Sequence, residues 1–137
     1  MTVDHVGIAV RSIEEASRFY EKMLGLKVAH REETPGHGVR VAFLAGDGQN
    51  ALIELLEPAL PENPIAKFLE TRGPGLHHLA FAAPGIETAM SRIAGLGVSL
   101  IDRSPRPGSR QTRVCFLHPK DCDGVLVELV EHARTKS

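Results

Sequence analysis

The chain repeats itself, and this repeat limits the fold more than any other feature of the sequence. The segment DHVGIAVRSIEEASRFYEKMLGLKV, from Asp4, aligns with HHLAFAAPGIETAMSRIAGLGVSL, from His77, with one residue fewer in the second copy. Further along, RVAFL and LIELLE in the first half align with RVCFL and LVELVE in the second. The two halves therefore share one order of secondary-structure elements.

Each copy is predicted to form a strand, a helix and then three strands. The opening runs HVGIAV and HLAFAA alternate between apolar and other residues, as strands with one buried face do. In the first copy, Ser12 and Glu15 have the spacing of a capping box, and Gly25 lies where the helix should end. Residues at helical spacing then predict one buried stripe in each helix: Ile13, Ala16, Tyr20 and Met23 in the first, and Ile86, Ala89, Met90 and Ile93 in the second.

Three strands are expected after each helix. The pairs are GLKVAHREE with GLGVSLIDR, VRVAFLA with TRVCFLH, and ALIELLE with VLVELVE. A connector bounded by Pro and Gly joins the copies and contains a short helix around Ile65 to Thr71. The sequence thus predicts an α+β fold of two tandem βαβββ modules in a single domain over residues 1–137, with module one at about 1–57, a linker at about 58–75 and module two at about 76–132.

Composition excludes several classes of function. With 16 Lys and Arg residues against 17 Asp and Glu residues, the chain has no basic surplus that would indicate a nucleic-acid partner. The N-terminus interrupts its apolar residues with charged ones, and no apolar run is long enough to span a bilayer, so we expect a cytoplasmic protein that does not enter membranes. Cys115 and Cys122 have neither zinc nor redox spacing and are expected to be free and reduced, with a disulfide as the alternative.

The repeat singles out four residues that could bind a metal ion. His5 aligns with His78, and Glu54 aligns with Glu128. Both glutamates lie inside apolar strands, where a lone carboxylate is costly unless its charge is neutralised. Two imidazoles and two carboxylates suit a divalent ion such as Co²⁺, Ni²⁺, Mn²⁺, Fe²⁺ or Zn²⁺. An old duplication that preserved paired structural residues would also explain the pattern.

The same alignment predicts different roles for the neighbouring histidines His77 and His78. Neighbouring strand residues point to opposite faces, and His78 shares the phase of His5. We therefore expect His78 to face the ion and His77 to point away, in a hydrogen-bonding role.

These motifs resemble the vicinal oxygen chelate superfamily and, within it, the methylmalonyl-CoA epimerase family. The resemblance covers nearly the whole chain and is carried by DHVGIAV, HGVRVAFL, ELLEP, AKFLETRGPGLHHLAF and FLHPKDCDGVLVELVE. It implies sheets that curl into a cup around a metal held by His5, Glu54, His78 and Glu128, with Co²⁺ as the first choice and Mn²⁺, Ni²⁺ or Zn²⁺ as others. Relatives often have Gln at the position of Glu54.

The implied reaction interconverts the (2R) and (2S) forms of methylmalonyl-CoA. An ion that binds one oxygen of the thioester and one of the carboxylate stabilises the enolate formed when the α-proton leaves. Glu128 is expected to be one acid/base. Some relatives carry a second glutamate at the position that is Val41 here, so Glu54 is the expected second acid/base, with His37 or a water molecule as alternatives.

The expected partners are an acyl-CoA substrate and a second copy of the chain. Arg103, Arg106, Arg110 and Arg113, with Lys120, are candidates for the CoA phosphates, although each could equally be an ordinary surface residue. Members of the superfamily commonly pair as homodimers, which would cover exposed strand edges.

Three rival functions remain open. Glyoxalase I, the lactoylglutathione lyase, uses a similar ligand set, so the ligands alone do not separate it from an epimerase. An extradiol dioxygenase needs two His and one carboxylate on Fe²⁺, and a fourth ligand would block its oxygen site. A metal-free small-molecule-binding module of the superfamily would not need all four positions.

Overall fold

A computed structural model describes residues 1–34, 38–48 and 51–133 of the chain. The chain divides into two compact units. The N-terminal unit is His5–His77, and the C-terminal unit combines Met1–Asp4 with His78–Ser137. Within the described residues, no helix is both long enough and apolar enough to cross a bilayer.

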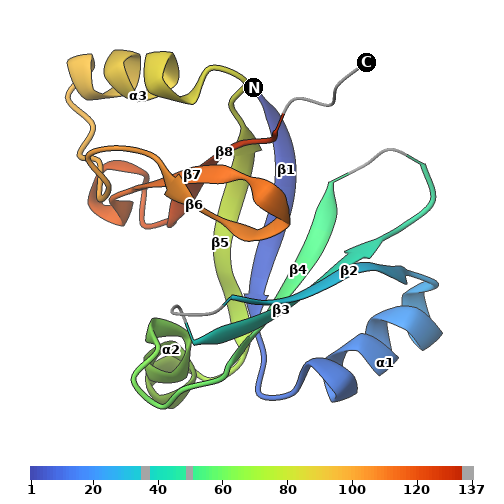
Figure 1. The fold of residues 1–137 in the computed structure, drawn as a ribbon. Helices are drawn as coiled ribbons and strands as arrows, with labels where there is room; N and C mark the ends of the chain where they lie inside the picture. Colours follow the sequence, from blue (N-terminus) through green and yellow to red (C-terminus); the bar gives the residue numbers. More distant parts are fainter. Residues whose placement is uncertain (35–37, 49–50, 134–137) are drawn as a thin grey trace. The chain divides into compact units, whose positions relative to one another are not determined.

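The N-terminal unit is a four-stranded mixed sheet with two helices (Figure 1). Its strands follow the order β2-β3-β4-β1, in which β1 runs parallel to β4 and the other pairs are antiparallel. The elements are β1 (Thr2–Ala9), α1 (Ile13–Leu24), β2 (Lys27–Thr34), β3 (Val39–Ala45), β4 (Leu52–Pro58) and α2 (Pro64–Arg72).

The C-terminal unit repeats this plan with the order β5-β8-β7-β6. Again the opening strand runs parallel to the last one, β5 to β8, and the others are antiparallel. The elements are β5 (Gly75–Ala82), α3 (Ile86–Gly95), β6 (Arg106–Pro107), β7 (Arg113–Leu117) and β8 (Val127–Glu131), with 3₁₀ turns at Ser109–Gln111 and Pro119–Asp121. The predicted α+β class is confirmed.

One predicted strand of the second copy is wrong. The segment GLGVSLIDR contains only an isolated bridge between Leu100 and Leu117, and the strand that pairs with β7 is the short β6. Two backbone amides that would donate to carbonyl groups in a β-ladder donate to side-chain carboxylates instead. The Ser99 amide donates to the carboxylate of Asp121 at 2.8 Å, and Asp102 accepts from the amide of Phe116 at 2.8 Å.

The predicted helix ends are confirmed in α1. Ser12 accepts a hydrogen bond from the Glu15 amide, and Gly25 takes the left-handed conformation, φ 72°, that ends the helix. The predicted buried stripe holds for Ile13, Ala16 and Tyr20, which pack on Ala42, Leu44 and Leu55 of the sheet. Met23 is 70% exposed, and its neighbour Leu24 is 59% exposed, so the buried stripe ends before the last turn of α1 and Met23 was wrongly included.

The helix starts of α1 and α3 are held by the same device in both units. Glu57, at the end of β4, accepts a hydrogen bond from the Ile13 amide at 2.8 Å, and Arg40 donates to Glu57 at 2.8 Å. In the C-terminal unit, Glu131 accepts from the Ile86 amide at 3.1 Å and also binds Arg113. The duplication therefore extends to the contacts that attach each helix to its sheet.

Candidate metal centre

The N-terminal unit brings His5 and Glu54 together. They lie on the neighbouring parallel strands β1 and β4, where Gly7 pairs with Glu54, so alternation puts both side chains on one face. The Nε2 atom of His5 is 3.2 Å from Oε1 of Glu54, and the residues are only 3% and 5% exposed. The Phe43 ring meets the imidazole edge-on, with centroids 5.5 Å apart and a 90° interplanar angle.

The C-terminal unit brings His78 and Glu128 together in the same way. Ala80 pairs with Glu128 across β5 and β8, which corresponds to the pairing in the first unit. The Nε2 atom of His78 is 3.5 Å from Oε1 of Glu128, and both residues are buried. Phe116 meets the imidazole edge-on, at 5.9 Å and 89°. In each unit, one His–Glu pair thus lies against the ring of one Phe.

The aromatic members of these clusters were missed by the sequence analysis. Phe43 and Phe116 lie directly across the ladder from Glu54 and Glu128. The signal was present, because the two phenylalanines occupy matched positions in RVAFL and RVCFL. A phenylalanine in an apolar strand is normally assigned to the core, and only the ring geometry shows that these two fix imidazole orientations.

The two pairs have the spacing of ligands that share an ion. Two atoms each about 2.1 Å from one ion, with an angle of 90–109° between them, lie roughly 3.0–3.4 Å apart. The separation of 3.2 Å in the N-terminal unit lies within this range, and the 3.5 Å in the C-terminal unit lies just above it. Neutral imidazoles with carboxylates also form a donor set that divalent transition ions favour. By spacing and by chemistry, each pair fits half of a metal site.

Most of the arginines expected to bind CoA are engaged inside the C-terminal unit. Arg113 spans Glu87 and Glu131, and Arg110 binds Asp4 at 2.7 Å. Arg106 lies over the Phe116 ring, with its guanidinium carbon 5.2 Å from the centroid, and also binds Asp102. Arg103 and Lys120 are exposed.

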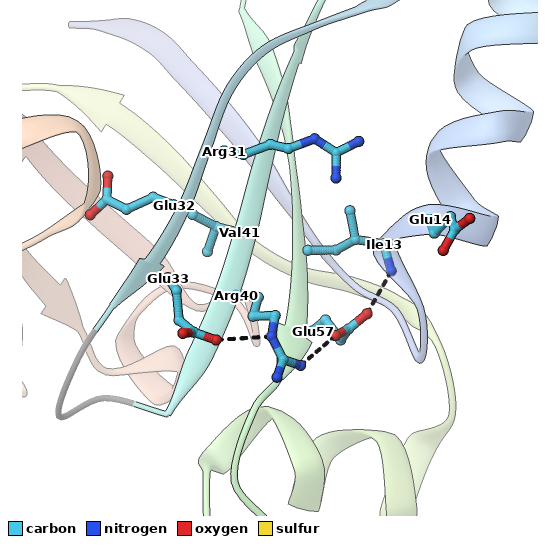
Figure 2. A pocket seen from close by; sticks show the side chains of 8 residues that line it. All are labelled: Ile13, Glu14, Arg31, Glu32, Glu33, Arg40, Val41 and Glu57. Carbon is cyan, nitrogen blue, oxygen red and sulfur yellow. Dashed lines mark hydrogen bonds and ion pairs between the residues drawn. The ribbon is translucent and has the colours of Figure 1, made fainter.

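A pocket of about 450 Å³ lies in the N-terminal unit beside the first turn of α1 (Figure 2). Its centre is an ion-pair chain in which Arg40 binds both Glu33 and Glu57. Figure 2 also shows Glu32 and Arg31 turned to opposite sides of β2. The pocket is lined by Ile13, Glu14, Arg31, Glu32, Glu33, Arg40, Val41 and Glu57, and so does not include the His5–Glu54 pair.

Comparison with known proteins places the chain in a family. Residues 4–116 match the model of the Glyoxalase/Bleomycin resistance protein/Dioxygenase superfamily. The ethylmalonyl-CoA/methylmalonyl-CoA epimerase of Cereibacter sphaeroides is 39% identical over 129 residues, which are 93% of this chain and 95% of that protein. The chain belongs to the methylmalonyl-CoA epimerase family. The resemblance inferred from the sequence is confirmed.

Solved epimerase structures share the fold over almost the entire chain. The methylmalonyl-CoA epimerase of Mycobacterium tuberculosis superposes with a TM-score of 0.93 at 41% identity, covering 97% of this chain and 89% of that one. A methylmalonyl-CoA epimerase in complex with methylmalonyl-CoA and NH₄⁺ gives a TM-score of 0.90 at 38% identity, covering 99% and 97%. A Bacillus subtilis relative, the uncharacterized protein YqjC, is 41% identical over 94% of this chain and 91% of its own length.

The sequence analysis considered Val41 and His37 in connection with the second acid/base. Val41, at the position where some epimerases carry a glutamate, is 2% exposed and packs with Ala9, Leu56 and the α2 residue Leu69. His37, an alternative acid/base, lies outside the described residues.

Proposed function

We propose that this protein interconverts (2R)- and (2S)-methylmalonyl-CoA by removing the α-proton and returning a proton to the opposite face. The observation that carries the proposal is the duplicated, buried His–Glu pair in a chain about 40% identical to epimerases over almost all of its length. An epimerisation needs no redox partner and no second substrate, so a small domain with one polar site is sufficient for it.

The proposal joins the two pairs in one site. His5, Glu54, His78 and Glu128 would together hold one divalent ion, with Co²⁺ as the first choice. When bound, the ion supplies positive charge that stabilises the enolate oxygens of the substrate. The glutamates balance the formal charge of the ion, and Phe43 and Phe116 keep each imidazole turned toward its carboxylate.

Proton transfer is proposed to involve Glu128. Its carboxylate would take the α-proton from one face of the substrate or return a proton to that face. The opposite face needs a second acid/base, for which the sequence offered Glu54. The face that carries Glu54 contains another carboxylate, Glu32.

Binding of the CoA moiety is proposed to use the loop that contains Arg103 and Arg106. Arg113 binds two glutamates, and Arg110 is largely buried in its ion pair with Asp4. The exposed Arg103 and Arg106, whose one ion pair is to Asp102, are therefore the stronger phosphate candidates. The enzyme is further proposed to be a cytoplasmic homodimer. Two free cysteines suit a reducing compartment, and burial raises the pKa of the Cys115 thiol to about 11, which keeps it unreactive.

The decisive experiment follows hydrogen exchange at C2 of the substrate. Incubated with Co²⁺ and (2S)-methylmalonyl-CoA in D₂O, the protein should wash deuterium into C2 and yield both stereoisomers. The same protein stripped with a chelator is the control, and it should lose both exchange and inversion. Absence of exchange together with hemithioacetal isomerisation would replace the proposal with a glyoxalase I-type lyase. Absence of any bound metal would favour a small-molecule-binding module.

A further inference from the structure

The proposed reaction needs one acid/base on each face of the substrate carbon, and two metal ligands are poorly suited to fill both roles. An enolate is planar, so a proton that leaves one face must be replaced from the other, and each carboxylate must approach the carbon to about 3 Å from its own side. A carboxylate that takes up a proton is also a weaker ligand. If both Glu54 and Glu128 acted as bases, two of the four donors would weaken during turnover.

One face of the N-terminal sheet carries His5 and Glu54, and its composition can be read from the strand registers. Phe43 pairs with Glu54, and His30 pairs with Phe43, so these side chains share that face across β4, β3 and β2. The other face is covered by α1, which packs on Ala42, Leu44 and Leu55. Among the described residues of the strands on the first face, the titratable groups are His5, Glu54, His30, Glu32 and the exposed Lys27, which pairs with Ala45 at the start of β2.

Glu32 is the carboxylate of this face that lies outside the proposed ligand set. It pairs directly with Val41 across the ladder, and Figure 2 shows both side chains on the side of β2 away from Arg31. Its Oε1 atom is 2.8 Å from Nε2 of His30. The His30 ring in turn lies beside Phe43, with centroids 6.2 Å apart. The His30–Glu32 pair and the His5–Glu54 pair thus stand on either side of one phenylalanine.

The two pairs differ in their access to solvent. The side chains of His5 and Glu54 are 4% and 6% exposed, whereas those of His30 and Glu32 are 41% and 28% exposed. A partly exposed carboxylate can meet a substrate and exchange its proton with water between turnovers. Val41 and Phe43 belong to β3, the strand between the two pairs, and both are almost fully buried, so the surroundings of the two pairs are apolar.

We propose that Glu32 is the second acid/base and that His30 is its positioning residue. This inference rests on the proposed function. In one direction, the Glu32 carboxylate forms an O–H bond with the C2 proton as the C2–H bond breaks. The electron pair of the C2–H bond enters the enolate. Protonated Glu128 then gives its proton to the opposite face of C2. Glu32 afterwards releases its proton to water, and Glu128 takes one up, so the net proton balance is zero.

The test is Glu32→Gln, which removes the base and keeps the shape and the contact to His30. Epimerisation should fall by about 10²–10⁴-fold. Glu128 should still exchange the C2 hydrogen of one stereoisomer with D₂O, without inversion, while exchange into the other isomer is lost. Glu33→Gln is the matched control, because Glu33 is the next residue on β2, points to the opposite face and binds Arg40. Its epimerisation rate should stay within a factor of two of the wild-type rate.

Three further variants complete the test. Glu32→Asp, which withdraws the carboxylate by one methylene, should keep exchange in both isomers at a reduced rate. His30→Gln should lower kcat more than it raises KM, because it disturbs the orientation of Glu32 rather than binding. Glu54→Gln should change metal affinity and lower exchange into both isomers together.

Several outcomes would overturn the inference. It is wrong if Glu32→Gln epimerises within threefold of wild type, or if it loses exchange in both isomers while its metal content is unchanged. It is also wrong if Glu54→Gln, rather than Glu32→Gln, separates exchange from inversion. If the wild-type protein itself exchanges neither isomer, the proposed function fails first, and the role of Glu32 fails with it.

Discussion

Two neighbouring histidines have different surroundings. His78 is 6% exposed and faces the carboxylate of Glu128, whereas the half-buried His77 packs its ring edge against Phe68 of α2, with centroids 5.1 Å apart. We predict that His78→Ala loses metal binding and epimerisation. His77→Ala should keep both and lower the free energy of unfolding by about 1 kcal/mol, the usual worth of an edge-on aromatic pair.

Metal content after dialysis and thermal unfolding of the two variants check this prediction. Each variant is the control for the other, since both remove an imidazole from β5. Loss of bound metal in His77→Ala, with retention in His78→Ala, would reverse the assignment of the two faces.

At the same scale, the sequence was informative where a residue had a repeat partner. His5, Glu54, His78 and Glu128 were selected in this way, and the structure places His5 beside Glu54 and His78 beside Glu128. Glu32 could not be found, because it lies in the charged run REE, which is typical of an exposed edge strand. Its face depends on the register with Val41 and on a bulge between Val28 and His30, and neither is written in the local sequence.

Among the elements, the helix starts depend on one carboxylate in each unit. Glu57 and Glu131 accept hydrogen bonds from the amides of Ile13 and Ile86, so each ties the first turn of a helix to the end of a strand. Glu57→Ala and Glu131→Ala should each lower the free energy of unfolding by about 1–2 kcal/mol, because a charged hydrogen bond to a helix amide is lost. Glu33→Ala, which removes only an exposed ion pair, should cost much less.

The stabilisation that Glu131 provides should decrease as the pH falls. Arg113 holds the pKa of Glu131 below its ordinary value, and the Ile86 amide adds to that shift. A carboxyl with a lowered folded-state pKa stabilises the fold fully above its unfolded pKa, about 4.5, and progressively less as the pH falls toward the folded value. Urea unfolding should therefore show a larger gap between wild type and Glu131→Ala at pH 7 than at pH 3.5. An equal gap at both pH values would contradict this account.

The elements also show where the repeat misled. GLGVSLIDR aligns with a true strand of the first copy, but Asp102 and Asp121 provide side-chain acceptors that compete for the amides of Phe116 and Ser99. In the first copy β2 pairs with β3 from Lys27 to Thr34, with one bulge between Val28 and His30. A duplication therefore predicts the order of elements well. It predicts edge strands poorly where acidic side chains replace the hydrogen bonds of the ladder.

For the whole molecule, the duplicated pairs pose a question of stoichiometry. His5 and Glu54 belong to one compact unit, and His78 and Glu128 belong to the other. Two independent half-sites would bind two ions weakly, each with two protein ligands. One shared site would bind a single ion with four ligands, and each unit would then need the other for binding.

If the four ligands share one site, each chain should bind one Co²⁺. A ligand variant in either unit should then cause the same loss of Co²⁺ binding. With Co²⁺ at about 100 times its Kd, binding to the folded state alone stabilises it by about 2.7 kcal/mol, which should raise Tm by about 10 °C. Both His5→Ala and Glu128→Ala should abolish that shift, even though they alter different units, because three ligands hold the ion far less tightly than four. Elemental analysis and thermal unfolding at several Co²⁺ concentrations measure both quantities. Two ions per chain, or a shift halved rather than abolished by each variant, would show that the units bind metal separately, and the ion could then not stabilise the enolate as proposed.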